Sequence, residues 1–186
     1  LVGISLSYQA GEAYYIPLNH DDDSADQLAL DIVLKELRPL LESSSNKIIG
    51  QNIKFDKNVL AKYEVDIASI KNDTMMMSYV LDASATRHNL DALSSYYLNY
   101  KTSTFEDVAG KGVKQITFDK VPIEAATNYA AEDADITLRL YEELNPRLEA
   151  EASLNKLNDE IEIPLIEVLS EMEQNGAILN LSLIHI

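Results

Sequence analysis

A tyrosine and an aspartate stand at helical spacing in the segment Asn128–Asp135. Tyr129 precedes Asp133 by four residues, so in a helix both side chains lie on one face, about one turn apart. A phenol and a carboxylate in this arrangement could work together on a water molecule bound to a metal ion. An ordinary amphipathic helix, with a half-buried tyrosine and solvated acids, would contain the same residues. The octapeptide alone favours that second interpretation.

A second acid, Asp56, follows a short apolar strand predicted at 47–50, with Asn52 four residues before it. In open α/β sheets, ligands bind beyond the carboxyl ends of the strands. An N-cap at Asn52 with a solvated Asp56 is the alternative. Asp56 and Asp133, converging from separate elements, would suit Mg²⁺ or Mn²⁺. Two such ions activate an attacking water and stabilise in-line displacement at phosphorus, and Tyr129 could orient that water.

Composition narrows the classes of protein to be considered. The 186 residues contain no cysteine, which excludes disulfides, Cys-based zinc sites and thiol nucleophiles. No run of about eighteen apolar residues occurs, so no membrane span is predicted. The formal net charge is -16, whereas a non-specific DNA binder is typically basic. A metal site needs clustered carboxylates, however, and a catalytic domain tethered to a basic one need not supply the affinity for DNA itself.

Hydrophobic periodicity predicts an α/β fold, with a mixed sheet, an antiparallel hairpin at one side and helices on its faces. Ser24 and Gln27 resemble a capping box at the start of the first helix. Residues 101–117 read as a polar loop, and Pro146 is expected to interrupt the helix that carries Tyr129. The strands are predicted at 1–8, 13–18, 47–50 and 67–70, and the helices at 25–42, 52–63, 73–81, 89–98, 123–144 and 146–174.

The motifs, taken in order, resemble a known family. From Leu1 to about Asn180 the chain is similar to the 3′–5′ proofreading exonuclease domain of bacterial DNA polymerase I enzymes (family A), in the DEDD superfamily with an RNase H-like fold. Gly50–Asp56 matches the second exonuclease motif of that family, and Tyr129–Asp135 matches the third. Three further stretches also look like the family: Asp73–Met75, Arg87–Leu93 and Thr104–Gly112.

The resemblance implies roles for the matching residues. Asp133 would ligate the tighter of two Mg²⁺ or Mn²⁺ ions, Asp56 would hold the second, and Tyr129 would position the nucleophilic water. The first motif of the family, Asp-x-Glu on the central strand before the hairpin, would precede Leu1. We therefore expect a fragment that lacks this strand, has two of four carboxylates, binds metal weakly and has little or no nuclease activity.

The resemblance also implies a substrate and a setting. Gln51 and Asn52 would contact the 3′-terminal nucleotides, Phe105 would stack on the frayed end, and Arg87 could face a phosphate. The expected partners are single-stranded or frayed DNA and a polymerase domain of the same chain, in a cytoplasmic, monomeric enzyme of replication and repair. Residues 1–150 would be the exonuclease domain, 151–180 the start of the polymerase domain, and 181–186 a non-native tail.

Three other functions would fit parts of the sequence. A catalytically inert, structural exonuclease-like domain of a family A polymerase is the nearest alternative, although the presence of Asp56, Tyr129 and Asp133 argues against it. A stand-alone nuclease acting on RNA would not need the helix that continues to Gln174. An unrelated acidic binding module would leave both motifs as coincidence. Reading Asp-x-Glu, or its replacement, upstream of Leu1 would decide between an active and an inert parent.

Overall fold

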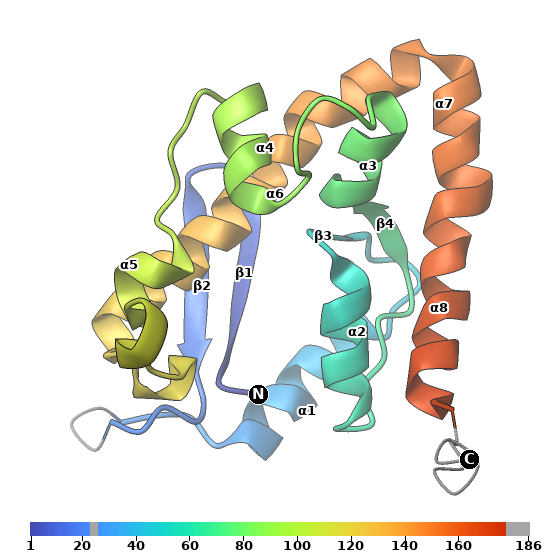
Figure 1. The fold of residues 1–186 in the computed structure, drawn as a ribbon. Coiled ribbons are helices and arrows are strands. Elements are labelled where there is room, and N and C mark those ends of the chain that lie inside the picture. Colours follow the sequence, from blue (N-terminus) through green and yellow to red (C-terminus); the bar gives the residue numbers. More distant parts are fainter. Residues whose placement is uncertain (23–25, 178–186) are drawn as a thin grey trace, which may run out of the picture.

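The computed structural model describes residues 1–22 and 26–177 and has a mixed α/β fold (Figure 1). No helix in this part of the chain is long and apolar enough to cross a membrane. The helices are α1 (Leu30–Leu41), α2 (Ile53–Ala61), α3 (Thr74–Leu81), α4 (Leu90–Tyr97), α5 (Phe105–Ala109), α6 (Ile123–Ala150), α7 (Ala152–Leu157) and α8 (Ile163–Asn175), with 3₁₀ turns at Gly112–Lys114 and Phe118–Lys120 and a π-helical turn at Asn158–Glu162.

Four described strands form two pairs. β1 (Gly3–Gln9) and β2 (Glu12–Pro17) make the expected antiparallel hairpin, in one register from Gly3 opposite Pro17 to Ser7 opposite Ala13 and with a shift before Gln9 opposite Glu12. β3 (Ile48–Gly50) and β4 (Ile70–Asp73) pair in parallel. The predicted α/β class and both kinds of pairing are confirmed, but the described strands form two separate two-stranded sheets rather than one mixed sheet. β4 also begins where the strand predicted at 67–70 ends.

The helix α6 joins the two halves of the molecule, because it packs on β1 and β2 and also on β3, α3 and α4 (Figure 1). Our expectation that Pro146 interrupts it is wrong, since α6 continues to Ala150. Pro146 is exposed, so water can reach the carbonyl that loses its helical partner. Leu144 and Leu148 on either side are fully buried, and their packing holds the helical path.

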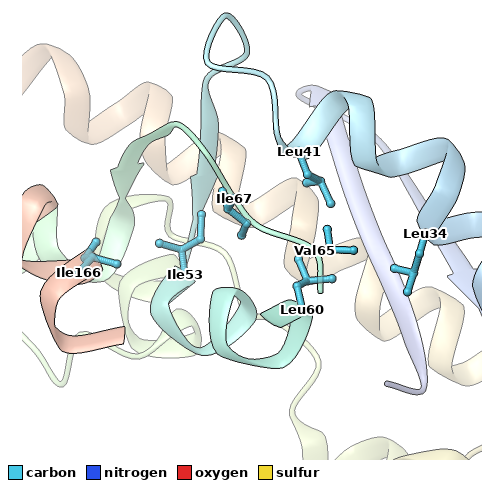
Figure 2. Close-up of a cluster of buried hydrophobic side chains, with 7 residues drawn as sticks. All are labelled: Leu34, Leu41, Ile53, Leu60, Val65, Ile67 and Ile166. Atoms are coloured by element: carbon cyan, nitrogen blue, oxygen red, sulfur yellow. The ribbon is translucent and has the colours of Figure 1, made fainter. Parts of the chain in front are cut away.

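The largest apolar cluster lies between α1, α2, α8 and the segment after α2 (Figure 2). It sets the position of α2, the helix that carries Asp56, because buried apolar groups fix an element far more tightly than its own propensity does. Ile166 brings α8 into the same cluster, so α8 packs as part of this core. The buried members are Leu34, Leu41, Ile53, Leu60, Val65, Ile67 and Ile166.

Two further sequence expectations need correction. The first helix begins at Leu30 rather than near residue 25, and the side chain of Gln27 bonds to the backbone N–H and C=O of His20 instead of a cap; Ser24 lies outside the described residues. The loop predicted at 101–117 contains α5. By contrast, α8 ends at Asn175, one residue beyond the end predicted at 174, and Gly176 follows at a φ of 65°, a conformation typical of glycine after a helix.

A buried lysine links α2 to α8. The side chain of Lys57 is 4% exposed, and its Nζ pairs with Asp66 and with Glu167 at 2.9 Å, whose side chains are 58% and 53% exposed. The desolvated charge is therefore the lysine's, whereas both carboxylates keep contact with water. We therefore expect different losses of stability when the lysine is replaced and when the two carboxylates are removed.

We expect Lys57→Met to change the free energy of unfolding by less than about 1 kcal/mol, because the carboxylates are rehydrated and methionine fills the space. The double variant Asp66→Ala/Glu167→Ala should cost about 3 kcal/mol, since it leaves an ammonium buried without a countercharge. Urea denaturation followed by far-UV circular dichroism measures both. A larger loss for Lys57→Met than for the double variant would contradict this account of the network.

Candidate active site

The centre of the candidate site is the pair Tyr129 and Asp133 on α6. A stripe of buried residues orients this helix, and both side chains of the pair are half-buried at its flank. The two side chains interact, because the Tyr129 hydroxyl lowers the pKa of the Asp133 carboxyl and Asp133 raises that of the phenol. The buried residues of the stripe are Ala126, Ala130, Ile136, Leu140, Leu144 and Leu148.

Asp133 sits in an environment that disfavours its charge. Loss of hydration raises the pKa of its carboxyl to about 7, with further contributions from Asp91 and Glu132, whereas the hydrogen bond from Tyr129 acts in the opposite direction. Burial and the neighbouring Asp133 charge raise the pKa of the Tyr129 phenol, so the phenol stays protonated and remains a donor at neutral pH. Within the described residues no lysine or arginine forms a salt bridge with Asp133. A carboxylate of this kind is suited to a cation that the protein does not itself supply.

Aromatic rings surround Tyr129. The ring centroid of Phe105, at the start of α5, lies 6.3 Å from that of Tyr129 in an edge-to-face arrangement. Phe118 lies 5.9 Å from Tyr129 and 6.2 Å from Phe105. Phe105 keeps 38% of its surface exposed. The structure therefore brings together the residue expected to stack on a base and the residue expected to position a water.

The second motif forms the corner between β3 and α2. Gly50 approaches Ile53 so closely that a Cβ would lie 2.6 Å from the Ile53 Cβ, which excludes a larger residue from this turn. Asn52 holds a left-handed conformation (φ 58°) and makes no side-chain cap. Instead Asp73, from the end of β4, accepts the backbone N–H groups of Asn52 and Ile53 at 3.1 and 2.8 Å.

Asp56 projects from the first turn of α2 as an exposed residue. Although the residue as a whole is exposed, protein atoms around its carboxyl reduce its hydration and, with repulsion from Asp73, raise its pKa to about 6. The groups that act on Asp133 lie instead on α4 and α6. In the part of the chain that the structure describes, no hydrogen bond or ion pair joins the two acids, and no group of three acid or histidine side chains could hold a metal ion.

The other residues predicted to contact DNA differ in how accessible their side chains are. The Gln51 side chain is engaged within the protein: its amide donates to the His88 carbonyl at 2.9 Å, and its oxygen accepts from the Thr74 hydroxyl. Asn52 is exposed beside it. Arg87, next to His88 and ahead of α4, is exposed as well. Gln51 thus ties the second motif to the segment that carries Arg87.

Sequence reasoning missed three residues around this site. Asp73 caps α3 at Met75 and Met76, and its second role at the start of α2 has no local sequence signal. Asp91 and Glu132 lie near Asp133 and influence its pKa. The acidic position directly before Asp133 was visible in the motif, but its hydrogen-bond partners come from a distant loop.

Comparison with known proteins identifies the family. The sequence profile described as 3′-5′ exonuclease, from family A DNA polymerases, matches residues 1–149. The chain belongs to this 3′-5′ exonuclease family. The exonuclease chain is 48% identical over all of its length to the DNA polymerase I of Pseudomonas aeruginosa, and 42% identical over 88% of its length to that of Rhizobium leguminosarum. It spans only 21% and 17% of these two relatives, about a fifth of their length.

Solved structures agree with the exonuclease fold. A structure of the "POL domain of Pol1 from M. smegmatis" with DNA primer-template and dNTP matches 94% of this chain and 25% of that one, with a TM-score of 0.69 and 19% identity. NrnC of Brucella melitensis matches 88% of this chain and 76% of its own, with a TM-score of 0.54 and 23% identity. The expected RNase H-like exonuclease fold is thereby confirmed.

Proposed function

We propose that this chain is the proofreading domain of a bacterial DNA polymerase I and that it serves to remove 3′-terminal nucleotides from DNA by hydrolysis. The observation that carries the proposal is the half-buried pair Tyr129 and Asp133 on one face of α6, with the partly exposed ring of Phe105 beside Tyr129, in a chain 48% identical along its whole length to a protein named DNA polymerase I. Residues 1–150 would form the exonuclease domain and 151–180 the start of the polymerase domain. The proposed non-native tail, 181–186, lies outside the described residues.

Asp133 and Asp56 would hold two divalent ions, Mg²⁺ or Mn²⁺. Carboxylate oxygens are the donors that these hard cations prefer. Loss of hydration, followed by repulsion from neighbouring acids, raises the pKa of both carboxyls, and a bound cation would compensate their charge. When bound, such ions activate water and stabilise charge at phosphorus.

Each residue of the chain has a distinct task in this proposal. Tyr129 keeps its proton and holds the Asp133 carboxylate in one orientation, which leaves the phenolic oxygen as an acceptor for the attacking water. Phe105 offers a partly exposed face to the terminal base, and stacking of that kind accepts any base. Asn52 and Arg87, both exposed, would contact the terminal nucleotides. Gln51 acts through the fold, because its amide group is engaged by His88 and Thr74.

The relatives named DNA polymerase I support a setting for this domain. A cytoplasmic, monomeric polymerase would hold the duplex through its polymerase domain and pass a frayed 3′ end to this acidic domain. Mismatched ends melt more readily, which would supply selectivity without contacts that read bases. This arrangement accounts for a domain of net charge -16 that acts on a polyanion.

The set of acids in the chain is incomplete. No Asp-x-Glu tripeptide occurs in the 186 residues, so two of the four carboxylates that the family uses are not supplied. We therefore expect little hydrolysis from these residues alone. An inert, structural exonuclease-like domain is the alternative, and the presence of Tyr129, Asp133 and Asp56 speaks against it.

The test compares two proteins on a 5′-labelled single-stranded oligonucleotide with Mg²⁺ or with EDTA. The complete polymerase carrying this domain should shorten the oligonucleotide from its 3′ end only with Mg²⁺, whereas the 186-residue chain should leave it intact. Hydrolysis by the 186-residue chain that Asp133→Ala abolishes would overturn the expected inactivity. A complete polymerase with Asp-x-Glu and no 3′ excision would overturn the proofreading function.

A further inference from the structure

The connector between α4 and α5, residues 98–104, has no helix or strand, yet its polar groups are held by side chains. The Ser94 hydroxyl donates to the Tyr100 carbonyl at 2.8 Å, and the Thr102 hydroxyl donates to the Asp91 carboxylate at 2.8 Å. Both of these partners belong to α4, so they fix the connector only to the helix that precedes it. A further contact is needed to fix it relative to α6.

Glu132 of α6 makes that contact with both of its oxygens. Oε1 accepts the Tyr100 hydroxyl at 2.7 Å, and Oε2 accepts the Ser103 backbone N–H at 2.7 Å. The guanidinium of Arg139, two turns further along α6, lies 5.4 Å from the centre of the Tyr100 ring. Hydrogen bonds to an ionised carboxylate are stronger than those between neutral groups. The Glu132 side chain of α6 thus holds the connector through two hydrogen bonds.

These two hydrogen bonds of Glu132 lie between Phe105 on one side of the candidate site and the pair Tyr129 and Asp133 on the other. Phe105 comes two residues after Ser103 and begins α5, and its ring meets Tyr129. On α6, Glu132 follows Tyr129 by three residues and directly precedes Asp133, so all three share one side of the helix. The lateral position of Phe105 relative to the Tyr129–Asp133 pair is therefore set through Glu132.

We propose that Glu132 is a positioning residue, which holds Phe105 where the base of a 3′-terminal nucleotide can stack while its phosphodiester reaches Asp133. This inference rests on the proposed function. It differs from a role for Glu132 as a metal ligand or as a general source of negative charge. The two roles separate experimentally, because the positioning role depends on hydrogen bonds and the electrostatic role depends on ionisation.

Three substitutions distinguish the roles. Glu132→Ala removes both hydrogen bonds. Glu132→Gln keeps an acceptor for Ser103 and can donate to the Tyr100 oxygen, but has no charge. Tyr100→Phe removes one donor and retains the ring under Arg139, so it serves as the mild variant if Glu132→Ala folds poorly.

Amide hydrogen exchange on the 186-residue chain measures directly whether Glu132 holds the connector. Glu132→Ala should lose protection at Ser103 and neighbouring amides and leave β3 and β4 unchanged, with Tyr100→Phe in the same direction and Glu132→Gln close to the wild type. Unchanged protection in Glu132→Ala would overturn the proposal.

The functional consequence is measured as the affinity of the complete polymerase for single-stranded DNA. EDTA is present so that hydrolysis does not interfere. Two oligo-dT strands are compared, one ending in a normal 3′ nucleotide and the other in an abasic 3′ residue. Glu132→Ala should bind the normal end about tenfold more weakly, the size of one lost stacking contact, and the abasic end as well as the wild type does. Glu132→Gln should bind both ends as the wild type does.

Equal losses at both ends, or the same loss in Glu132→Gln as in Glu132→Ala, would overturn the positioning role in favour of an electrostatic one. If the wild type itself neither prefers the normal end nor excises nucleotides in Mg²⁺, the proposed function fails instead. Amide exchange would then still decide whether Glu132 holds the connector.

Discussion

Asp133→Asn is expected to lower 3′-terminal excision by the complete polymerase at least about a thousandfold, since a metal-ion site contributes several kcal/mol to stabilising the transition state. The same substitution should stabilise the 186-residue chain at neutral pH. The pKa of the carboxyl is raised to about 7 by burial, whereas in an unfolded chain it is about 3.9. The folded protein therefore binds the proton more tightly, and stability falls as the pH rises from about 4 to about 7.

Asparagine has no proton to lose, and its oxygen still accepts from Tyr129. The variant should match the wild type near pH 4 and exceed it by on the order of 2 kcal/mol above pH 7, a value reduced for partial hydration of the carboxyl. Urea unfolding at pH 4, 6 and 8 measures this difference, with Glu124→Gln, exposed on the same helix, as the control. If the free energies of unfolding of the wild type and Asp133→Asn changed in parallel with pH, the Asp133 charge would not destabilise the fold as expected.

The sequence alone places Tyr129 and Asp133 on one face of a helix, because their spacing follows from helical geometry. It does not show that Asp133 is partly buried, so the octapeptide by itself also fits an ordinary amphipathic helix. The hairpin, β3, α3 and α4 were predictable for a related reason. Each is specified by a short local pattern of apolar residues with its own turn or cap, such as Asn89 ahead of α4.

Other features depend on contacts between distant segments, which a local pattern does not contain. Pro146 read as a helix break, but the buried leucines on both sides of it keep α6 continuous. The polar segment 101–117 read as a loop, yet Asp107 accepts hydrogen bonds from the backbone and hydroxyl of Thr104 and starts α5 there. The family resemblance implied that Phe105 stacks on the frayed end, but no local pattern places it beside Tyr129, because Glu132 and its two partners lie about thirty residues apart.

Asp73 shows the same limit most strongly, and its removal should have the largest effect on stability. It is 1% exposed. Its two oxygens accept backbone N–H groups from the first residues of two helices: Oδ2 from Ile53, and Oδ1 from Asn52, Met75 and Met76. Burial raises the pKa of its carboxyl, and these hydrogen bonds act in the opposite direction. The carboxylate is therefore the shared cap of α2 and α3.

Asp73→Ala leaves these donors without an acceptor in a site closed to water. One cap is worth about 1 kcal/mol, and each buried unsatisfied group costs about 1–3 kcal/mol, so we expect a loss of about 4 kcal/mol in the free energy of unfolding. Asp73→Asn should lose about half as much, because its oxygen can serve one helix while its amide group faces the donors of the other. Urea denaturation measures both, with Asp82→Ala as an exposed control near the end of α3.

The same substitution connects stability to the proposed chemistry. Asn52 and Asp56 occupy the first turn of the helix that Asp73 holds, so a chain that survives Asp73→Asn should show lower exonuclease activity without any change at α6. In the complete polymerase this predicts reduced excision together with normal nucleotide incorporation. If Asp73→Asn destabilised the domain and left excision untouched, the position of α2 would not depend on this cap, and Asp56 would have to be held by the apolar cluster around Ile53 and Leu60 alone.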